Sequence, residues 1–122
     1  MIVDATNRIR KFIDFINAKN LTDVPCEIAL LTANGAVTEG GETAFAVYFW
    51  DKKVMYVAAE LSYLAEEEGM TEADVERVIF ENMAHEYVHH LQYVRGDEVS
   101  EEEAERVCRE WGNEYFGEQA DV

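Results

Sequence analysis

The chain has 122 residues, a hydrophobic fraction of 48% and a formal net charge of -16 at pH 7, from 26 acidic and 10 basic residues. This length is too short for two ordinary domains, so we expect residues 1–122 to form a single domain with one hydrophobic core. The hydrophobic content excludes a disordered chain, and the negative charge repels nucleic-acid phosphates and anionic lipid surfaces. We therefore expect neither nucleic acid nor a membrane as a partner.

The two cysteines, Cys26 and Cys108, are too few and too far apart in the sequence to predict a disulfide framework. Both have apolar neighbours and are expected to be small buried residues. Charged residues interrupt the first twenty positions, so no signal peptide is predicted, and no apolar run is long enough to span a membrane. We expect a cytoplasmic protein.

The first half of the chain alternates between one helical and several strand-like patterns. Apolar residues at helical spacing over 5–18 predict an amphipathic helix that lies on another element. Residues 26–32 are rich in Ile and Leu and precede an Asn-Gly turn at 34–35, which predicts a first strand. The aromatic and β-branched runs at 44–50 and 54–57 predict a hairpin. We expect a small three-stranded, mainly antiparallel sheet.

The second half is predicted to be helical. A short helix at 61–68 precedes a long helix that starts after Thr71 and runs to about Arg95. Its apolar residues cover most of the circumference, so protein must surround it. A Gly-Asp pair at 96–97 ends this helix, and Ser100 opens another with a capping-box sequence. With so short a loop the two helices should pack antiparallel as a hairpin, and the predicted fold class is α+β.

The long helix carries an H-E-x-x-H pattern at 85–89. Residues four apart lie on one helix face, so His85 and His89 can bind one cation. Glu86 is rotated by about 100° from His85, which places its carboxylate beside the metal, where a metal-bound water would lie. The third histidine of the chain is the adjacent His90. Burying these polar groups without partners is costly, so we predict one Zn²⁺ held by His85 and His89, with Glu86 as the general base.

A catalytic zinc site has three protein ligands, and no histidine follows His90, so either an acidic residue completes the set or the site is incomplete. The inward-facing stripe of the last helix favours Glu101, whereas height along the hairpin favours Glu105. The residues alone leave both open, and a solvated, dipole-complementing first turn is the alternative for each. His90 is expected to be partly exposed, and Tyr87 and Tyr93 to be packing residues.

The pattern at 85–89, followed by Glu-Glu-Glu-Ala-Glu at 101–105, resembles the gluzincin metallopeptidases, in which H-E-x-x-H precedes E-x-x-A or E-x-x-S and then an acidic or amide residue. It is most similar to minigluzincins and ImmA/IrrE-type metallopeptidases. The resemblance implies a minimal zincin-like domain in which Glu101 is the third zinc ligand and Glu105 supports a ligating histidine. It covers most of the chain coarsely and about 25 residues specifically.

Three functions are compatible with these residues. The first is a zinc peptidase, in which Glu86 takes a proton from a metal-bound water that attacks a carbonyl of a peptide or protein substrate. The resemblance implies that an edge strand within 44–57 pairs with this substrate. The second is a catalytically inactive or latent domain that zinc staples together and that binds a protein partner. The third is a metal-free acidic interaction protein or nucleic-acid mimic, and two histidines satisfied within a packed helix would belong to it.

Overall fold

The structure is a computed structural model that describes residues 6–31, 36–37, 43–59 and 69–120. Within these ranges it confirms the α+β class, with one helix before the strands and two helices after them. The predicted helix at 61–68 lies outside the described residues. In chain order the elements are α1 (Thr6–Asn17), β1 (Glu27–Leu31), β2 (Ala36–Val37), β3 (Thr43–Ala44), β4 (Ala46–Phe49), β5 (Val54–Ala58), α3 (Glu72–Arg95) and α4 (Glu101–Ala120).

The main sheet has the strand order β1-β5-β4, and β2 pairs separately with β3. β4 and β5 pair antiparallel as the predicted hairpin, with Phe49 opposite Val54, whereas β1 runs parallel to β5, with Glu27 opposite the same Val54. The sheet is therefore mixed, and the prediction of a mainly antiparallel sheet is wrong for the β1–β5 pair. Burial explains the order: β5 contributes the fully buried Met55 and Val57 and takes the central position, so β1 joins the hairpin alongside β5.

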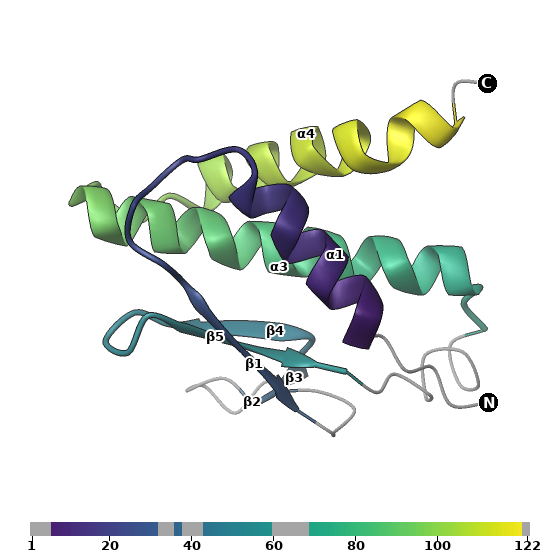
Figure 1. The fold of residues 1–122 in the computed structure, drawn as a ribbon, viewed down its shortest axis with the longest axis horizontal. Helices are drawn as coiled ribbons and strands as arrows, with labels where there is room; N and C mark the ends of the chain where they lie inside the picture. Colours follow the sequence, from purple (N-terminus) through teal and green to yellow (C-terminus); the bar gives the residue numbers. More distant parts are fainter. Residues whose placement is uncertain (1–5, 32–35, 38–42, 60–68, 121–122) are drawn as a thin grey trace.

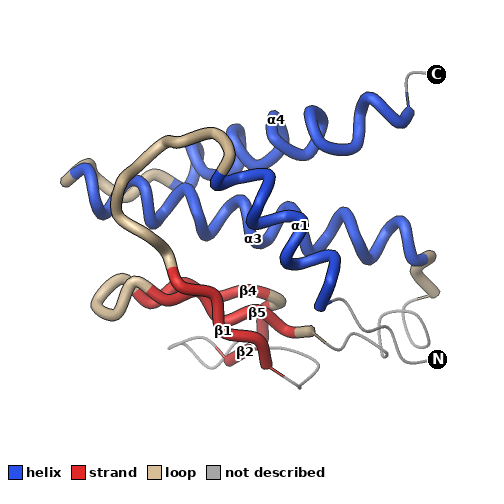
Figure 2. Tube along the Cα trace, viewed as in Figure 1, coloured by secondary structure: helices blue, strands red, loops and turns tan. Residues whose placement is uncertain are grey.

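Helix α3 lies between the sheet and α4 (Figure 1). Helices α1, α3 and α4 all lie on the same side of the sheet, and α1 packs across α3 (Figure 2). Neighbours on three sides therefore bury most of the circumference of α3, as its sequence predicted. No helix in the described ranges is long and apolar enough to cross a membrane. The buried residues of α3 are Val75, Ile79, Phe80, Met83, Ala84, Tyr87, Val88, His90, Leu91 and Gln92.

Local capping fixes both ends of α3. The Asp74 amide donates to Thr71 Oγ1 at 3.2 Å, and the Thr71 amide donates to the Asp74 carboxylate at 3.2 Å, which completes a capping box. At the other end Gly96 adopts a left-handed φ of 74°, and its N–H donates to the carbonyls of Gln92 and Tyr93. A Cβ would be strained in this conformation, so the sequence itself sets the length of the helix that carries the histidines.

An aromatic cluster joins the three helices far from the α3–α4 loop. The ring centroid of Phe12 on α1 lies 5.1 Å from that of Phe80 on α3 and 5.3 Å from that of Tyr115 on α4, both edge to face. Phe80 and Tyr115 stack at 5.0 Å. Each such pair contributes roughly 0.5–1.5 kcal/mol beyond the burial of apolar area. The cluster holds α4 in one position along α3, and this position determines which side chains meet nearer the loop.

Replacing Phe80 by alanine should lower the free energy of unfolding by about 3–5 kcal/mol, because Phe80 is fully buried and its loss leaves a cavity between three helices. Equilibrium unfolding in urea measures the change. Val99→Ala is the control, since Val99 is 72% exposed, and it should change stability by less than about 0.5 kcal/mol. A loss at Phe80 as small as that of the control would contradict the role given to the cluster.

Candidate metal centre

The antiparallel packing of α4 on α3 brings three donor groups together. His85 and His89 lie one turn apart on α3, and Glu101 is the first residue of α4. The Nε2 atoms of the two imidazoles are 3.2 Å apart. One carboxylate oxygen of Glu101 lies 3.0 Å from His85 Nε2, and the other lies 2.9 Å from His89 Nε2. The three side chains are close enough to hold one metal ion together.

A buried amide fixes the ring of His89. Nδ1 of His89 lies 2.9 Å from Oε1 of Gln92, and an amide oxygen can only accept, so Nδ1 carries the hydrogen and Nε2 keeps its lone pair for a metal. The amide nitrogen of Gln92 donates to the Ser100 carbonyl at 3.1 Å and to Glu103 Oε1 at 3.0 Å. The Ser100 amide donates back to Gln92 Oε1 at 3.3 Å. One side chain therefore orients a candidate ligand and ties it to the start of α4.

The Gln92 contacts also modify the predicted capping box of α4. Ser100 Oγ accepts from the Glu103 amide at 3.1 Å, as predicted, but the Glu103 carboxylate accepts from Gln92 instead of completing the box. Sequence reasoning missed Gln92. The signal was available, because a glutamine three residues after His89 lies on the same helix face as that histidine, among apolar residues.

Glu105 lies behind His85, in the supporting position that the resemblance to gluzincins implies. Its Oε1 lies 3.3 Å from Nδ1 of His85, the ring nitrogen that does not face Glu101. A carboxylate at Nδ1 holds the hydrogen there and leaves Nε2 free to bind a metal. Of the two glutamates that the sequence left open, Glu101 faces the Nε2 atoms of both histidines, and Glu105 faces one histidine from behind.

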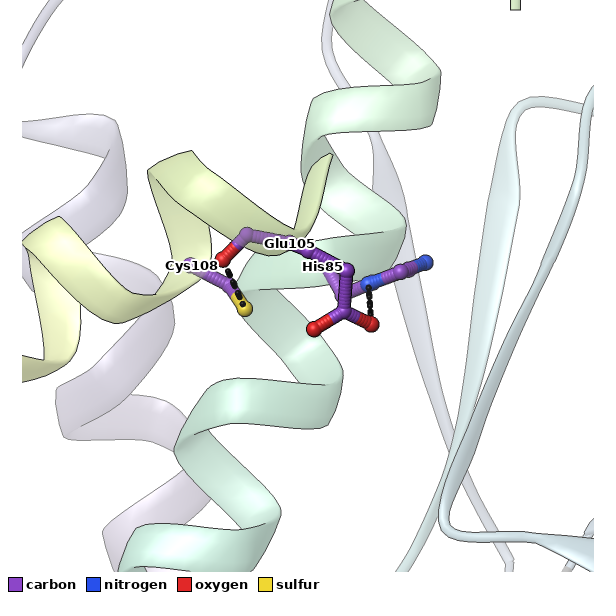
Figure 3. A group of neighbouring side chains, drawn as sticks. All are labelled: His85, Glu105 and Cys108. Atoms are coloured by element: carbon purple, nitrogen blue, oxygen red, sulfur yellow. Dashed lines mark hydrogen bonds and ion pairs between the residues drawn. The ribbon is translucent and has the colours of Figure 1, made fainter. Parts of the chain in front are cut away.

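A second group of potential donors consists of His85, Glu105 and Cys108 (Figure 3). The Cys108 thiol donates to the Glu105 carbonyl at 3.2 Å. Burial, together with the charges of Glu105 and Glu81, raises the pKa of this thiol to about 11. Metal coordination needs the thiolate, so this group is the weaker site. Because the two groups share His85 through opposite ring nitrogens, Glu105 is better placed as a support for the first group.

Glu86 lies beside the donors at the meeting point of two cavities. A cavity of about 530 Å³ is lined by Glu86 together with His89 and Glu101, and one of about 330 Å³ by Glu86 together with His85 and Glu105. Burial raises the pKa of Glu86 to about 7, with His89 lowering it and Glu101 raising it. A carboxyl group with such a pKa can exchange a proton near neutral pH.

Two expectations for neighbouring residues are wrong. His90 is fully buried instead of partly exposed: its Nε2 donates to the Val24 carbonyl at 2.9 Å, and its Nδ1 accepts from the Tyr48 hydroxyl at 2.7 Å. Burial lowers the pKa of His90, so the ring is neutral and structural. Tyr87 is buried as a packing residue, but Tyr93 is 40% exposed and lines the larger cavity.

Comparisons with protein-family models, with curated proteins and with solved structures find no match for this chain. The functional interpretation therefore depends on the geometry of the donors, the amide and carboxylate behind them, and Glu86 with its two cavities.

Purified protein should bind about one equivalent of a divalent cation, with Zn²⁺ as the probe. His89→Ala and Glu101→Ala should each weaken binding at least about 100-fold, because each removes one of three donors. Cys108→Ser is the control and should keep the wild-type affinity. Competition with a chromophoric chelator measures the affinities. Loss of binding in Cys108→Ser with retention in Glu101→Ala would assign the ion to the other group.

Gln92→Met keeps the volume of the side chain and removes its hydrogen bonds. We expect it to weaken Zn²⁺ binding by about 10–100-fold, because the His89 ring loses the partner that fixes its orientation. Glu102→Gln, on the exposed side of α4, is the control. Unfolding of the metal-free variant should be measured in parallel, since Gln92 also joins the two helices. A stability loss without any change in affinity would refute the orienting role.

Proposed function

We propose that this protein is a zinc-dependent peptidase of the gluzincin type, in which His85, His89 and Glu101 hold Zn²⁺ and Glu86 is the general base. The observation that carries the proposal is the convergence of three donors from two helices beside a half-buried carboxylate, Glu86, that is not one of them. A cavity next to the donors gives a substrate room to reach them.

The distances between the donors suit zinc. Two ligand atoms at about 2.0–2.1 Å from a tetrahedral Zn²⁺ lie about 3.3 Å apart. The donor pairs of His85, His89 and Glu101 are separated by 3.2, 3.0 and 2.9 Å. Two imidazole nitrogens and a carboxylate are a donor set that zinc accepts in catalytic sites. Bound there, Zn²⁺ would acidify a water molecule and polarise a peptide carbonyl.

The roles of the protein groups follow from their positions. Glu86 lines the cavities on both sides of the donors, so its carboxylate would accept the proton of the attacking water and could return it to the leaving amine. Gln92 and Glu105 hold the imidazoles of His89 and His85 in the tautomer that presents Nε2. The hydrogens on both Nδ1 atoms are thus kept away from the metal.

The sheet offers a place for an extended substrate. β4 lies at one edge of the main sheet and, among the described strands of that sheet, pairs with β5 alone. Its residues Ala46 and Tyr48 line the two cavities beside Glu86. A peptide that added itself to this edge by main-chain hydrogen bonds would pass in front of the donors. The substrate of the proposed reaction is accordingly a peptide or an extended segment of a protein.

A second function keeps the metal without catalysis. The donors come from two helices, so an ion would tie α3 to α4, and the chain carries a net charge of -16. These features suit a latent or inactive zinc-stapled domain that binds a protein partner. The half-buried Glu86 beside the donors favours the peptidase, because a structural site needs no proton acceptor there.

Glu86→Gln separates the two functions. In a peptidase this variant should retain Zn²⁺ and lose at least about 100-fold of the wild-type rate, because the amide cannot accept the proton. Hydrolysis of a mixed fluorogenic peptide library, together with the zinc content, measures both quantities. Glu102→Gln is the matched control and should cleave at the wild-type rate. Zinc-loaded wild-type protein without cleavage would favour the interaction module, and full activity in Glu86→Gln would refute the general base.

A further inference from the structure

One cavity is lined by three large apolar side chains that are exposed to solvent in the described part of the chain. They are Trp50, Tyr93 and Val99, with exposed fractions of 59%, 40% and 72%. Single exposed apolar residues are ordinary, but a cluster of them around a concavity is typical of a binding surface. The cavity measures about 530 Å³, which falls within the range of about 300–1,000 Å³ found for small-ligand sites.

The aromatic wall of this cavity is held from two separate elements. Trp50 follows β4 at the start of the turn to β5, and Tyr93 lies in the last turn of α3. Their ring centroids are 5.4 Å apart and the ring planes are inclined by 44°. The ammonium group of Lys53 lies 5.6 Å from the Tyr93 ring centroid, a cation–π contact that supports the ring. The wall therefore exists before any ligand binds.

A third ring borders the same cavity. Tyr48 lies on β4, and its hydroxyl donates to His90 Nδ1 at 2.7 Å. His90 is itself fixed because its Nε2 donates to the Val24 carbonyl at 2.9 Å. With its polar end occupied by a buried histidine, Tyr48 contributes chiefly its ring to the cavity. The surface offered to a ligand is thus mainly aromatic.

Carboxylates and metal donors occupy the rest of the lining. His89 and Glu101 belong to the candidate centre, so a group in the cavity adjoins the proposed ion. Glu86 and Asp97 line the cavity as well. Zn²⁺ would offset the charges of Glu86 and Glu101, whereas Asp97 belongs to neither donor group and would repel an acidic ligand.

We propose that this cavity is a specificity pocket that takes a large apolar side chain, such as Phe or Leu, from the residue next to the cleaved bond, and that it disfavours acidic residues there. Trp50, Tyr93 and Val99 are its specificity-determining residues. This inference rests on the proposed peptidase function, because it places the pocket beside the carbonyl that would react. It adds the class of substrate, which the motif alone does not give.

Binding tests the pocket without relying on catalysis. Acetyl-capped hydroxamates of phenylalanine, alanine and aspartate serve as probes on zinc-loaded protein, since the hydroxamate binds the metal and leaves the side chain to sample the cavity. Isothermal titration should give at least about tenfold tighter binding for the phenylalanine probe than for the alanine probe, and the weakest binding for the aspartate probe. Plain acetohydroxamate reports binding to the metal alone.

Variants then assign the preference to named residues. Trp50→Ala and Tyr93→Ala should each lower the affinity for the phenylalanine probe by about five- to tenfold and leave the affinity for acetohydroxamate unchanged. Trp111→Phe is the matched control, because Trp111 lies on α4 against Tyr87 and does not line the cavity. It should bind all probes as the wild type does. Circular dichroism confirms that each variant is folded.

The outcomes separate the two proposals. Equal affinity for all side chains, or an unchanged phenylalanine preference in Trp50→Ala and Tyr93→Ala, would overturn the pocket while the metal site stands. Failure of every probe, acetohydroxamate included, to bind zinc-loaded protein would instead refute an accessible catalytic metal, and the pocket would fall with it.

Discussion

The hydrogen bonds of Gln92 are the constraint on which the candidate site depends. This single amide contacts His89 on its own helix and Ser100 and Glu103 at the start of α4, and it is almost fully buried. A buried amide that lost these partners would cost roughly 1–3 kcal/mol, so the two helices are held in one relative position near the loop. The aromatic cluster around Phe80 does the same at the far end. Between these two fixed points, Glu101 and Glu105 of α4 face the histidines of α3.

The sequence predicted the helices well because their signals are local. Thr71 and Gly96 mark the two ends of α3 through hydrogen bonds to residues close by in the sequence. The apolar residues around the whole circumference of α3 predicted that protein surrounds it. The hairpin of β4 and β5 was equally local. The direction of β1 was not, because it depends on which strand takes the centre of the sheet. That outcome depends on contacts between distant parts of the chain, in which β5 lies between β1 and β4 and contributes the fully buried Met55 and Val57.

The residues of the candidate site also divide into those that local sequence signals predict and those that depend on long-range packing. His85, Glu86 and His89 were predictable because the helical period alone places them. The choice between Glu101 and Glu105 required the register of two helices, which local patterns do not give. The contact between Gln92 and Ser100 centres the hairpin near Gly96. His89 therefore comes level with the beginning of α4. The burial of His90 and the exposure of Tyr93 could not be predicted for a similar reason, because the sequence does not tell which face of α3 the sheet covers.

Electrostatics links the composition of the chain to its candidate centre. Without a cation, burial raises the pKa of Glu86 and the Glu101 carboxylate also acts to raise it, while Glu105 adds a further negative charge on the other side of His85. A divalent ion would reverse the local field, pairing with Glu101 and favouring the charged form of Glu86. The net charge of -16 adds a long-range attraction for cations to this local one. Because the donors belong to two helices, the free energy of binding the ion would add to the stability of their packing.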